Sequence, residues 1–217
     1  MKFNLLDKAT WNRKEHYEHY MNRVRCSYSV VVNLDITELR HELKKLGLKD
    51  YIAQIYIMTR SVNSFHEFRM SLDENGHLGY WDMVNPLYTA LNKEKETFSS
   101  IWTPYDHSFA TFYDACSDDI ERFCTGEFSP KPNCPENIFT ISSVPWIDFT
   151  AFNINVFSDA AYLLPIFTIG KYTEQDGKIL MPLAIQVHHA VCDGLHVGRF
   201  VEKVKSLVAD CKQWLPQ

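Results

Sequence analysis

The clearest pattern in the chain is an apolar stripe at helical spacing near its C-terminus. Apolar residues recur there every three or four positions, at Val197, Phe200, Val201, Val204, Leu207, Val208 and Cys211. This spacing places them along one side of an α-helix. We therefore expect a C-terminal amphipathic helix that packs on a sheet.

The segments before this helix have the composition of strands. β-Branched and aromatic residues dominate the four runs NIFTISS, FTAFNINV, IFTIGKYT and KILMPLAIQVHH, which all follow residue 136. Residues 174–177 (EQDG) separate the last two runs and predict a hairpin turn. Residues 73–76 (DENG) predict a second hairpin between residues 67–72 and 78–82, and SYSVVVNLD at Ser27–Asp35 predicts a further strand.

Helix formers dominate much of the first half of the chain. We expect helices at residues 11–24, 36–46, 51–65 and 106–123, with Gly47 ending the second. Neither an internal repeat nor a linker rich in Pro, Gly or Ser interrupts the sequence. The prediction is one α+β domain, residues 1–217, a two-layer sandwich whose mostly antiparallel or mixed sheet is covered by helices.

Composition narrows the classes of function. The 217 residues are 46% hydrophobic and carry 22 Lys and Arg against 27 Asp and Glu, a net charge of −5. This balance argues against binding to nucleic acid. The longest apolar run, at residues 160–169, is broken by Pro165 and is too short to span a bilayer. The six cysteines form no CxxC pair and no zinc pattern, so we expect no metal and a reducing, cytoplasmic setting.

The segment HHAVCDG is the sharpest candidate for chemistry. His188 and His189 end the apolar strand LMPLAIQV, just before the C-terminal helix. Histidine has an ordinary pKa of about 6.5 and is the natural general base at neutral pH. Asp193 could return toward the strand end and fix the local backbone, and Gly194 is expected to supply a turn that a residue with a Cβ atom makes with difficulty. The alternative is a pair of structural histidines at a strand end.

This segment resembles the HHxxxDG signature of CoA-dependent acyltransferases, which include chloramphenicol acetyltransferases and the cores of dihydrolipoyl acyltransferases. From about residue 3 to the end, further segments match chloramphenicol acetyltransferases in family order, namely WNRKEH (11–16), ETFSS (96–100), PEN (135–137), SSVPW (142–146), FNIN (152–155) and HVGR (196–199). Dihydrolipoyl enzymes normally carry a lipoyl domain and linker before this core, and we see neither.

The resemblance implies a mechanism and assigns its residues. His189 is expected to remove the proton from the 3-hydroxyl of chloramphenicol as that oxygen attacks the thioester of acetyl-CoA. Ser142 matches the serine that donates a hydrogen bond to the oxyanion, and Thr168 matches a threonine that acts near it through water. Asp193 and Arg13 match a buried ion pair that holds the active-site backbone. The acetyl group passes directly, with no acyl-enzyme.

The resemblance also implies two binding sites and an assembly. The chloramphenicol site is expected at Tyr20, Cys26, Phe98, Phe128, Phe152 and Ile154. The acetyl-CoA site is expected at Lys49, Tyr51, Trp146 and Tyr172. Family members are homotrimers with active sites between subunits, so we expect His189 of one chain to face the drug-pocket residues of its neighbour.

Two residues depart from the family pattern in or beside the acceptor site. His19 stands where a Phe is common, and Leu195 replaces the Phe of the DGFH form of the signature. Because of these two residues, the same acyl transfer to another hydroxyl acceptor remains an alternative function. A third hypothesis, a drug-binding or acyl-CoA-binding protein without turnover, is less consistent with the intact set of catalytic residues. A His189→Ala variant would separate an enzyme from a binding protein.

Overall fold

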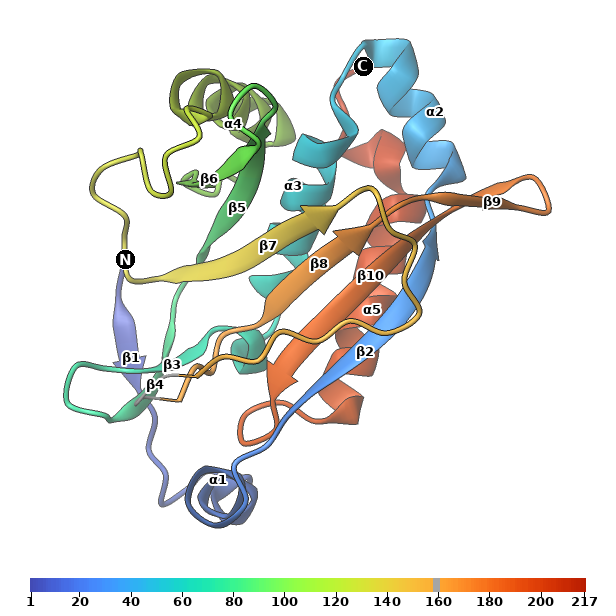
Figure 1. The fold of residues 1–217 in the computed structure, drawn as a ribbon. Coiled ribbons are helices and arrows are strands. Elements are labelled where there is room, and N and C mark those ends of the chain that lie inside the picture. The colour runs from blue at the N-terminus through green and yellow to red at the C-terminus, as the bar shows by residue number, and fades with distance from the viewer. Residues whose placement is uncertain (158–160) are drawn as a thin grey trace.

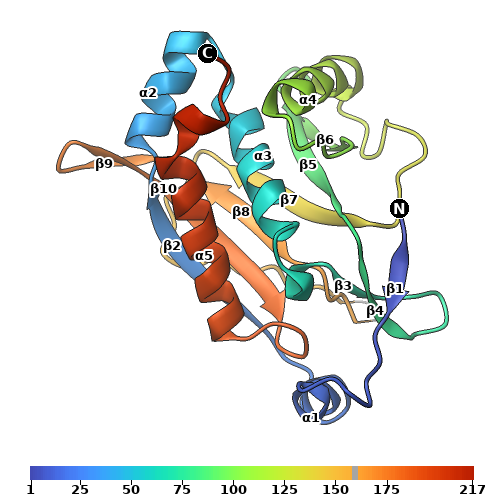
Figure 2. The same cartoon turned by 180° about the vertical axis from the view of Figure 1, so that it is seen from behind.

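The computed structural model describes residues 1–157 and 161–217 as a mixed sheet with helices packed on one face (Figure 1). The view from behind shows α3 and α5 lying side by side across the sheet (Figure 2). The helices are α1 (Lys14–Glu18), α2 (Thr37–Leu46), α3 (Asp50–Val62), α4 (Phe109–Phe123) and α5 (Gly194–Ala209). The predicted two-layer α+β architecture is confirmed.

The large sheet has the strand order β2-β10-β8-β7-β5-β6. β7 is parallel to β8 and β5, and the other neighbours on this path are antiparallel. A further strand, β9, pairs with β10 across the predicted hairpin turn, where Asp176 and Gly177 have positive φ angles of 51° and 76°. The bounds are β2 (Ser27–Asp35), β5 (Asn85–Asn92), β6 (Thr97–Trp102), β7 (Ile138–Val144), β8 (Ile166–Gly170), β9 (Thr173–Gln175) and β10 (Lys178–His188).

A small sheet lies at one end of the molecule, in the order β1-β4-β3. The predicted hairpin at residues 73–76 joins β3 (Met70–Leu72) to β4 (Leu78–Trp81), and β1 (Phe3–Leu5) pairs with β4. Gly76 has a φ of +78°, which is easily adopted only without a Cβ atom. Gly47 likewise ends α2 with a φ of +68°.

The core lies between the large sheet and the helices. The predicted stripe of α5 is buried, and its Phe200 ring stacks between Phe68 and Phe167 at centroid distances of 4.7 and 5.1 Å. Cys211 is also buried, but it lies beyond α5 in a short 3-10 turn. α3 is buried along most of its length, which explains why its sequence is apolar on more than one face.

The structure corrects the strand predictions in two places. Residues 149–156 (FTAFNINV) form no strand although they are apolar and β-branched. They cross the open face of the sheet, and the Gln186 side chain binds the backbone N and O of Ile154 at 2.8 and 2.7 Å. An amide side chain thus provides the hydrogen bonds that a neighbouring strand would otherwise provide. Conversely, β5 and β6 were not predicted from the sequence.

Candidate active site

Aromatic rings and the backbone fix His189 just beyond the end of β10. Its backbone N donates to the carbonyl O of Cys26 at 2.9 Å. The ring of Tyr20 stacks on the imidazole with centroids 4.0 Å apart and an interplanar angle of 9°, and Tyr28 meets it edge-on at 5.2 Å. Nδ1 is buried and has no partner among the described residues. The orientation of the ring is therefore set mainly by packing.

His188 has a different role from its neighbour. It pairs with Ser27 at the end of the β10–β2 ladder, and its Nδ1 accepts from Ala190 N at 3.2 Å. Burial, with His189 and Arg25 nearby, lowers the pKa of His188. A neutral ring that accepts a backbone hydrogen bond serves to shape the turn.

Asp193 and Arg13 form the ion pair that the sequence predicted. Asp193 is the N-cap of α5, where its Oδ1 accepts from Leu195 N at 3.1 Å while its Oδ2 pairs with Arg13 Nη1. Burial alone would raise the pKa of Asp193, but the hydrogen bond from Arg13 and the neighbouring charges outweigh it and leave that pKa below its usual range. Arg13 is the N-cap of α1, so the ion pair fastens α1 to the turn before α5.

Gly194 does not have the role expected from the sequence. It is the first residue of α5 and lies outside the positive-φ glycines, and a Cβ atom built on it meets nothing within 4 Å. The expectation of a turn that requires glycine is therefore wrong. The sharp change of direction is made by Asp193, whose extended φ and ψ of −117° and −179° suit an N-cap.

Ser142 and Thr168 form a second polar centre on β7 and β8. They are direct partners in this parallel pair, and their hydroxyl oxygens are 2.9 Å apart. Ser142 is half-buried, whereas Thr168 is buried. When one of two adjacent hydroxyls donates a hydrogen bond to the other, the proton of the second hydroxyl is free to be donated to a third atom.

A single chain does not bring Ser142 and His189 together. Thr168 pairs with Ala184 on β10, and His189 lies five residues further along the chain. At about 3.3 Å per residue, roughly 16 Å separates the hydroxyl pair from the imidazole. The arrowheads of β8 and β10 accordingly point to opposite ends of the sheet (Figure 1). One carbonyl carbon cannot lie within reach of both groups of the same chain.

Of the four residues expected to bind acetyl-CoA, two follow β7 and β8 and two lie at the start of α3. Trp146 follows β7 and is 62% exposed, and the next residue is tied to the chain after β8 by a backbone bond from Lys171 N to Ile147 O. Tyr172 follows β8, and its hydroxyl accepts from Gln54 of α3. Lys49 is the N-cap of α3, and Tyr51 lies in its first turn.

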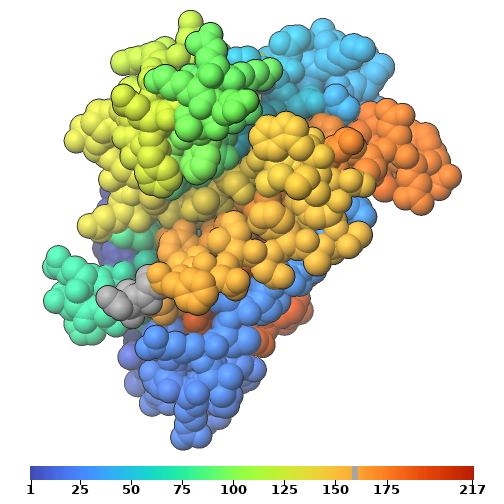
Figure 3. Space-filling view, viewed as in Figure 1, coloured from blue at the N-terminus to red at the C-terminus, as the bar shows by residue number. Residues whose placement is uncertain are grey.

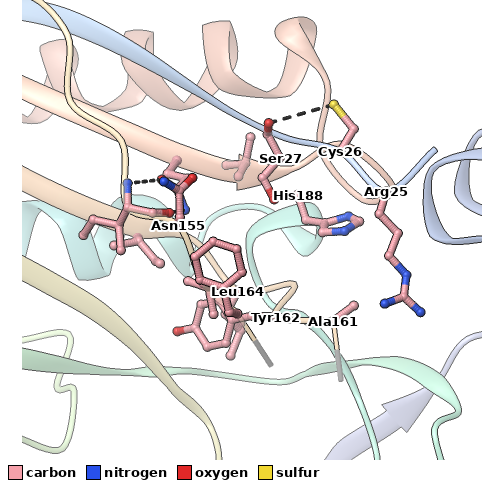
Figure 4. A pocket seen from close by; sticks show the side chains of 14 residues that line it. Arg25, Cys26, Ser27, Asn155, Ala161, Tyr162, Leu164 and His188 are labelled. Atoms are coloured by element: carbon pink, nitrogen blue, oxygen red, sulfur yellow. Dashed lines mark hydrogen bonds between the residues drawn. The ribbon is translucent and has the colours of Figure 1, made fainter. Parts of the chain in front are cut away.

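A pocket of about 410 Å³ opens on the sheet face near the end of β10. Among the predicted acceptor residues, Cys26 and Ile154 line it. His188 lines it too, and Figure 4 shows its ring on the same side of the pocket as the guanidinium of Arg25. The segment carrying residues 149–156 lies over this face (Figure 3, gold). His189 is not part of the lining.

The other predicted acceptor residues lie in separate places. Tyr20 stacks on His189. Phe98 of β6 and Phe128 form an edge-to-face pair with centroids 5.9 Å apart, and they are 47% and 72% exposed. Phe152 packs on Phe149 at 5.1 Å. Within one chain, the set does not form one pocket.

Sequence reasoning missed two residues that build this site. Tyr28 contacts the imidazole of His189, and Gln186 holds the segment over the pocket. Tyr28 lies in the predicted strand Ser27–Asp35, close to the predicted Cys26, but a tyrosine in a strand is common. Gln186 carried the better signal, because it is the one amide inside the apolar run LMPLAIQV.

Within residues 1–157 and 161–217, no three His, Cys, Asp or Glu side chains lie where they could hold a metal ion. No helix of those residues is long and apolar enough to cross a membrane.

Two solved acetyltransferases have this fold. A chloramphenicol acetyltransferase superimposes with a TM-score of 0.86 and 23% identity, covering 95% of this chain and all of that one. The dihydrolipoamide acetyltransferase of Azotobacter vinelandii gives a TM-score of 0.66 at 20% identity, covering 93% of this chain and 88% of that one. The chain therefore shares the fold of these two acetyltransferases.

Sequence comparison shows to which family with this fold the chain belongs. The family model described as chloramphenicol acetyltransferase matches residues 1–205. A chloramphenicol acetyltransferase of Bacillus pumilus is 58% identical over 94% of this chain and 92% of its own length. Another, of Clostridium perfringens, is 51% identical over 99% of both chains. The chain belongs to the chloramphenicol acetyltransferase family.

Proposed function

We propose that this enzyme transfers the acetyl group of acetyl-CoA to the 3-hydroxyl of chloramphenicol and so confers resistance to the antibiotic. The observation that carries the proposal is sequence identity of up to 58%, along almost the whole chain, with enzymes named chloramphenicol acetyltransferase. The placement of His189, Asp193, Arg13, Ser142 and Thr168 at two polar centres of the fold supports it.

His189 acts as the general base. With its proton on the buried Nδ1, the lone pair of Nε2 accepts the proton of the attacking hydroxyl. Stacking by Tyr20 and edge contact by Tyr28 restrict the ring, so the base is held in position before substrate binds. A positioned base of this kind accelerates a reaction by about 10²- to 10⁴-fold.

Ser142 stabilises the tetrahedral intermediate. Its hydroxyl donates to the oxyanion that forms on the thioester carbonyl, while Thr168, 2.9 Å away, holds its orientation and takes part through water. Cys192 does not form an acyl-enzyme, because it is buried and burial raises the pKa of its thiol well above the ordinary range. The acetyl group therefore passes directly from CoA to the acceptor.

Each active site combines residues of two chains in a homotrimer. The separation of roughly 16 Å between the Ser142–Thr168 pair and His189 supports this, since both must reach one reacting carbon. The exposed residues Trp146, Ile147, Val156 and Phe157 provide apolar surface for such contacts. His189 of one chain then faces drug-pocket residues and Ser142 of the next.

Acetyl-CoA is held by side chains and shape. Lys49 lies at the start of α3 and can reach a phosphate, while the exposed ring of Trp146 can pack on adenine or pantetheine. Tyr51 is oriented by a bond from its hydroxyl to Thr89 O at 3.0 Å. All six thiols are free, as a reducing compartment requires, and the cytoplasmic location stays a prediction.

Release of free CoA thiol from acetyl-CoA, followed with a thiol reagent, tests the proposal. We expect release that depends on chloramphenicol and an acetylated drug as product. Folded protein that releases thiol only with another alcohol would favour the alternative acceptor suggested by His19 and Leu195, both of which are exposed. Protein that binds chloramphenicol without any thiol release would favour a binding function.

A further inference from the structure

His196 is a buried imidazole that the mechanism above does not use. It lies in the first turn of α5 and is 8% exposed. Its Nδ1 is 3.0 Å from the backbone N of Asp193 and 2.9 Å from the Oδ1 of the same residue. Its Nε2 is 3.5 Å from Oε1 of Glu67, in the turn between α3 and β3.

The backbone contact favours one tautomer. The backbone N–H of Asp193 donates to Nδ1, which places the ring proton on Nε2, facing the Glu67 carboxylate, whereas the Oδ1 of Asp193 beside Nδ1 favours the opposite tautomer. The short 3-10 turn that carries Glu67 is fixed, because the adjacent Phe68 stacks on Phe200 of α5 at 4.7 Å. The imidazole therefore joins two rigid parts of the molecule.

Asp193 is thereby held at its backbone and its side chain. His196 binds the backbone N, Leu195 N donates to Oδ1, and Arg13 pairs with Oδ2. Arg13 is the N-cap of α1, and the π-helical turn that follows α1 carries Tyr20 against the imidazole of His189. Side-chain contacts thus run from Glu67 to Arg13, and the backbone of residues 13–20 connects Arg13 to Tyr20 at the general base.

We propose that His196 is a positioning residue for acetyl transfer, which fixes Asp193 and, through Arg13 and Tyr20, the orientation of His189. This inference rests on the proposed function. His196 does not touch substrate; its removal is expected to lower kcat and leave the KM of both substrates nearly unchanged. A residue that only stabilised the fold would lower the amount of active protein but not the rate per folded site.

The charges around His196 are consistent with a neutral ring. Burial lowers its pKa most strongly, the carboxylates of Glu67 and Asp193 oppose that effect, and Arg13 and Arg199 add to it. The net pKa lies below the ordinary value. Acid would place a proton on Nδ1 and remove the acceptor for the Asp193 N–H.

A matched pair of substitutions tests the proposal. Glutamine in the third position of a helix accepts from the N-cap backbone in a capping box, so His196→Gln restores the acceptor without the imidazole. We expect His196→Gln to keep kcat within about threefold of the parent, and His196→Leu to lower it by about 10- to 100-fold with KM values within about twofold. Circular dichroism normalises both rates to folded protein.

Either of two kinetic results would overturn the proposal: a parental kcat in His196→Leu, or equal impairment in both variants. If His196→Leu does not fold, His196→Ala takes its place, with the same expected loss of kcat. NMR spectroscopy of protein labelled selectively with ¹⁵N-histidine gives a readout that needs no substrate. The His196 signals are identified by their absence in His196→Gln. They must show an unprotonated Nδ1 and a protonated Nε2. The opposite tautomer refutes the proposal even if chloramphenicol proves to be the wrong acceptor.

Discussion

At the scale of single residues, the site depends on packing as much as on hydrogen bonds. His189 lies between two tyrosine rings, whereas Ser142 is oriented by a neighbouring hydroxyl. The HHxxxDG signature identified His189 and Asp193 from the sequence. Tyr28 was missed because nothing in a strand sequence says which ring will face an imidazole across a turn.

Replacing His189 with alanine should abolish turnover and preserve binding. Without a base, we expect kcat to fall by at least about 100-fold, with the dissociation constant of chloramphenicol changed severalfold at most. Thiol release and equilibrium dialysis measure the two quantities. His16→Ala, at an exposed position of α1, is the matched control and should behave as the parent. Turnover of His189→Ala at the parental rate would show that another group is the base.

Replacing Ser142 with alanine should lower kcat by about 10²- to 10³-fold, because the oxyanion loses a donor. KM for acetyl-CoA should change little, since the bond forms with the intermediate. Ser143→Ala is the control: alternation along β7 points its side chain to the opposite face. The assignment is wrong if the two variants are equally active in steady-state assays.

At the scale of elements, most helices and strands were predictable because their local pattern and their buried faces agree. Residues 149–156 were not, since a β-branched sequence says that a segment is extended but not whether it joins a ladder. The missing information is Gln186, a long-range partner. β6 was missed for the same reason. Its edge is covered by residues 126–131, and the sequence of β6 does not reveal this distant partner.

Lys131 fastens that covering segment to the rest of the molecule. Its Nζ lies 2.7 Å from both carboxylate oxygens of Asp119 on α4, donates to Trp102 O, and lies 4.2 Å from the Trp102 ring centroid. Because both side chains are largely buried, Lys131→Met leaves an unpaired buried carboxylate, and we expect a loss of about 3–5 kcal/mol in the free energy of unfolding.

Urea unfolding measures this loss. The double variant Lys131→Met/Asp119→Asn should recover part of it, because no buried charge remains. Lys95→Met, at an exposed position, should be neutral within about 0.5 kcal/mol. A Lys131→Met variant as stable as Lys95→Met would mean that the buried ion pair contributes no net stability.

The ion pair between α1 and the turn before α5 should make stability depend on acid. The folded-state pKa of Asp193 lies below its usual range, so its contribution to stability is complete at neutral pH and is lost as pH falls through that lowered value. We expect the difference in unfolding midpoint between the parent and Asp193→Asn to shrink between about pH 5 and pH 2. A difference that stays constant over this range would contradict the assignment.

At the scale of the whole molecule, the sequence-predicted catalytic residues are all present but in two groups. The resemblance to a trimeric family had implied sites between subunits, and the strand register supplies a physical reason for them. No local pattern encodes that separation, because it depends on how β10 pairs with β8.

Mixing two inactive variants tests the shared site. If His189 and Ser142 come from different subunits, neither His189→Ala nor Ser142→Ala is active alone, but a trimer refolded from both has some sites with both groups intact. Equal random mixing should restore about a quarter of the parental sites. Mixing without joint refolding is the control and should restore none. Activity that never exceeds that of the separate variants would place both groups in one chain.

The way Gln186 holds residues 149–156 has a consequence for changing the acceptor. Both of its bonds go to backbone atoms of Ile154, so these two bonds do not depend on the side chains that the segment carries. The side chains of Ile154 and Val156 line the pocket beneath. The segment is therefore suited to directed evolution of the acceptor specificity. Substitutions at Phe152, Ile154 and Val156 are expected to change which alcohol is accepted, while Gln186 continues to hold the backbone of the segment.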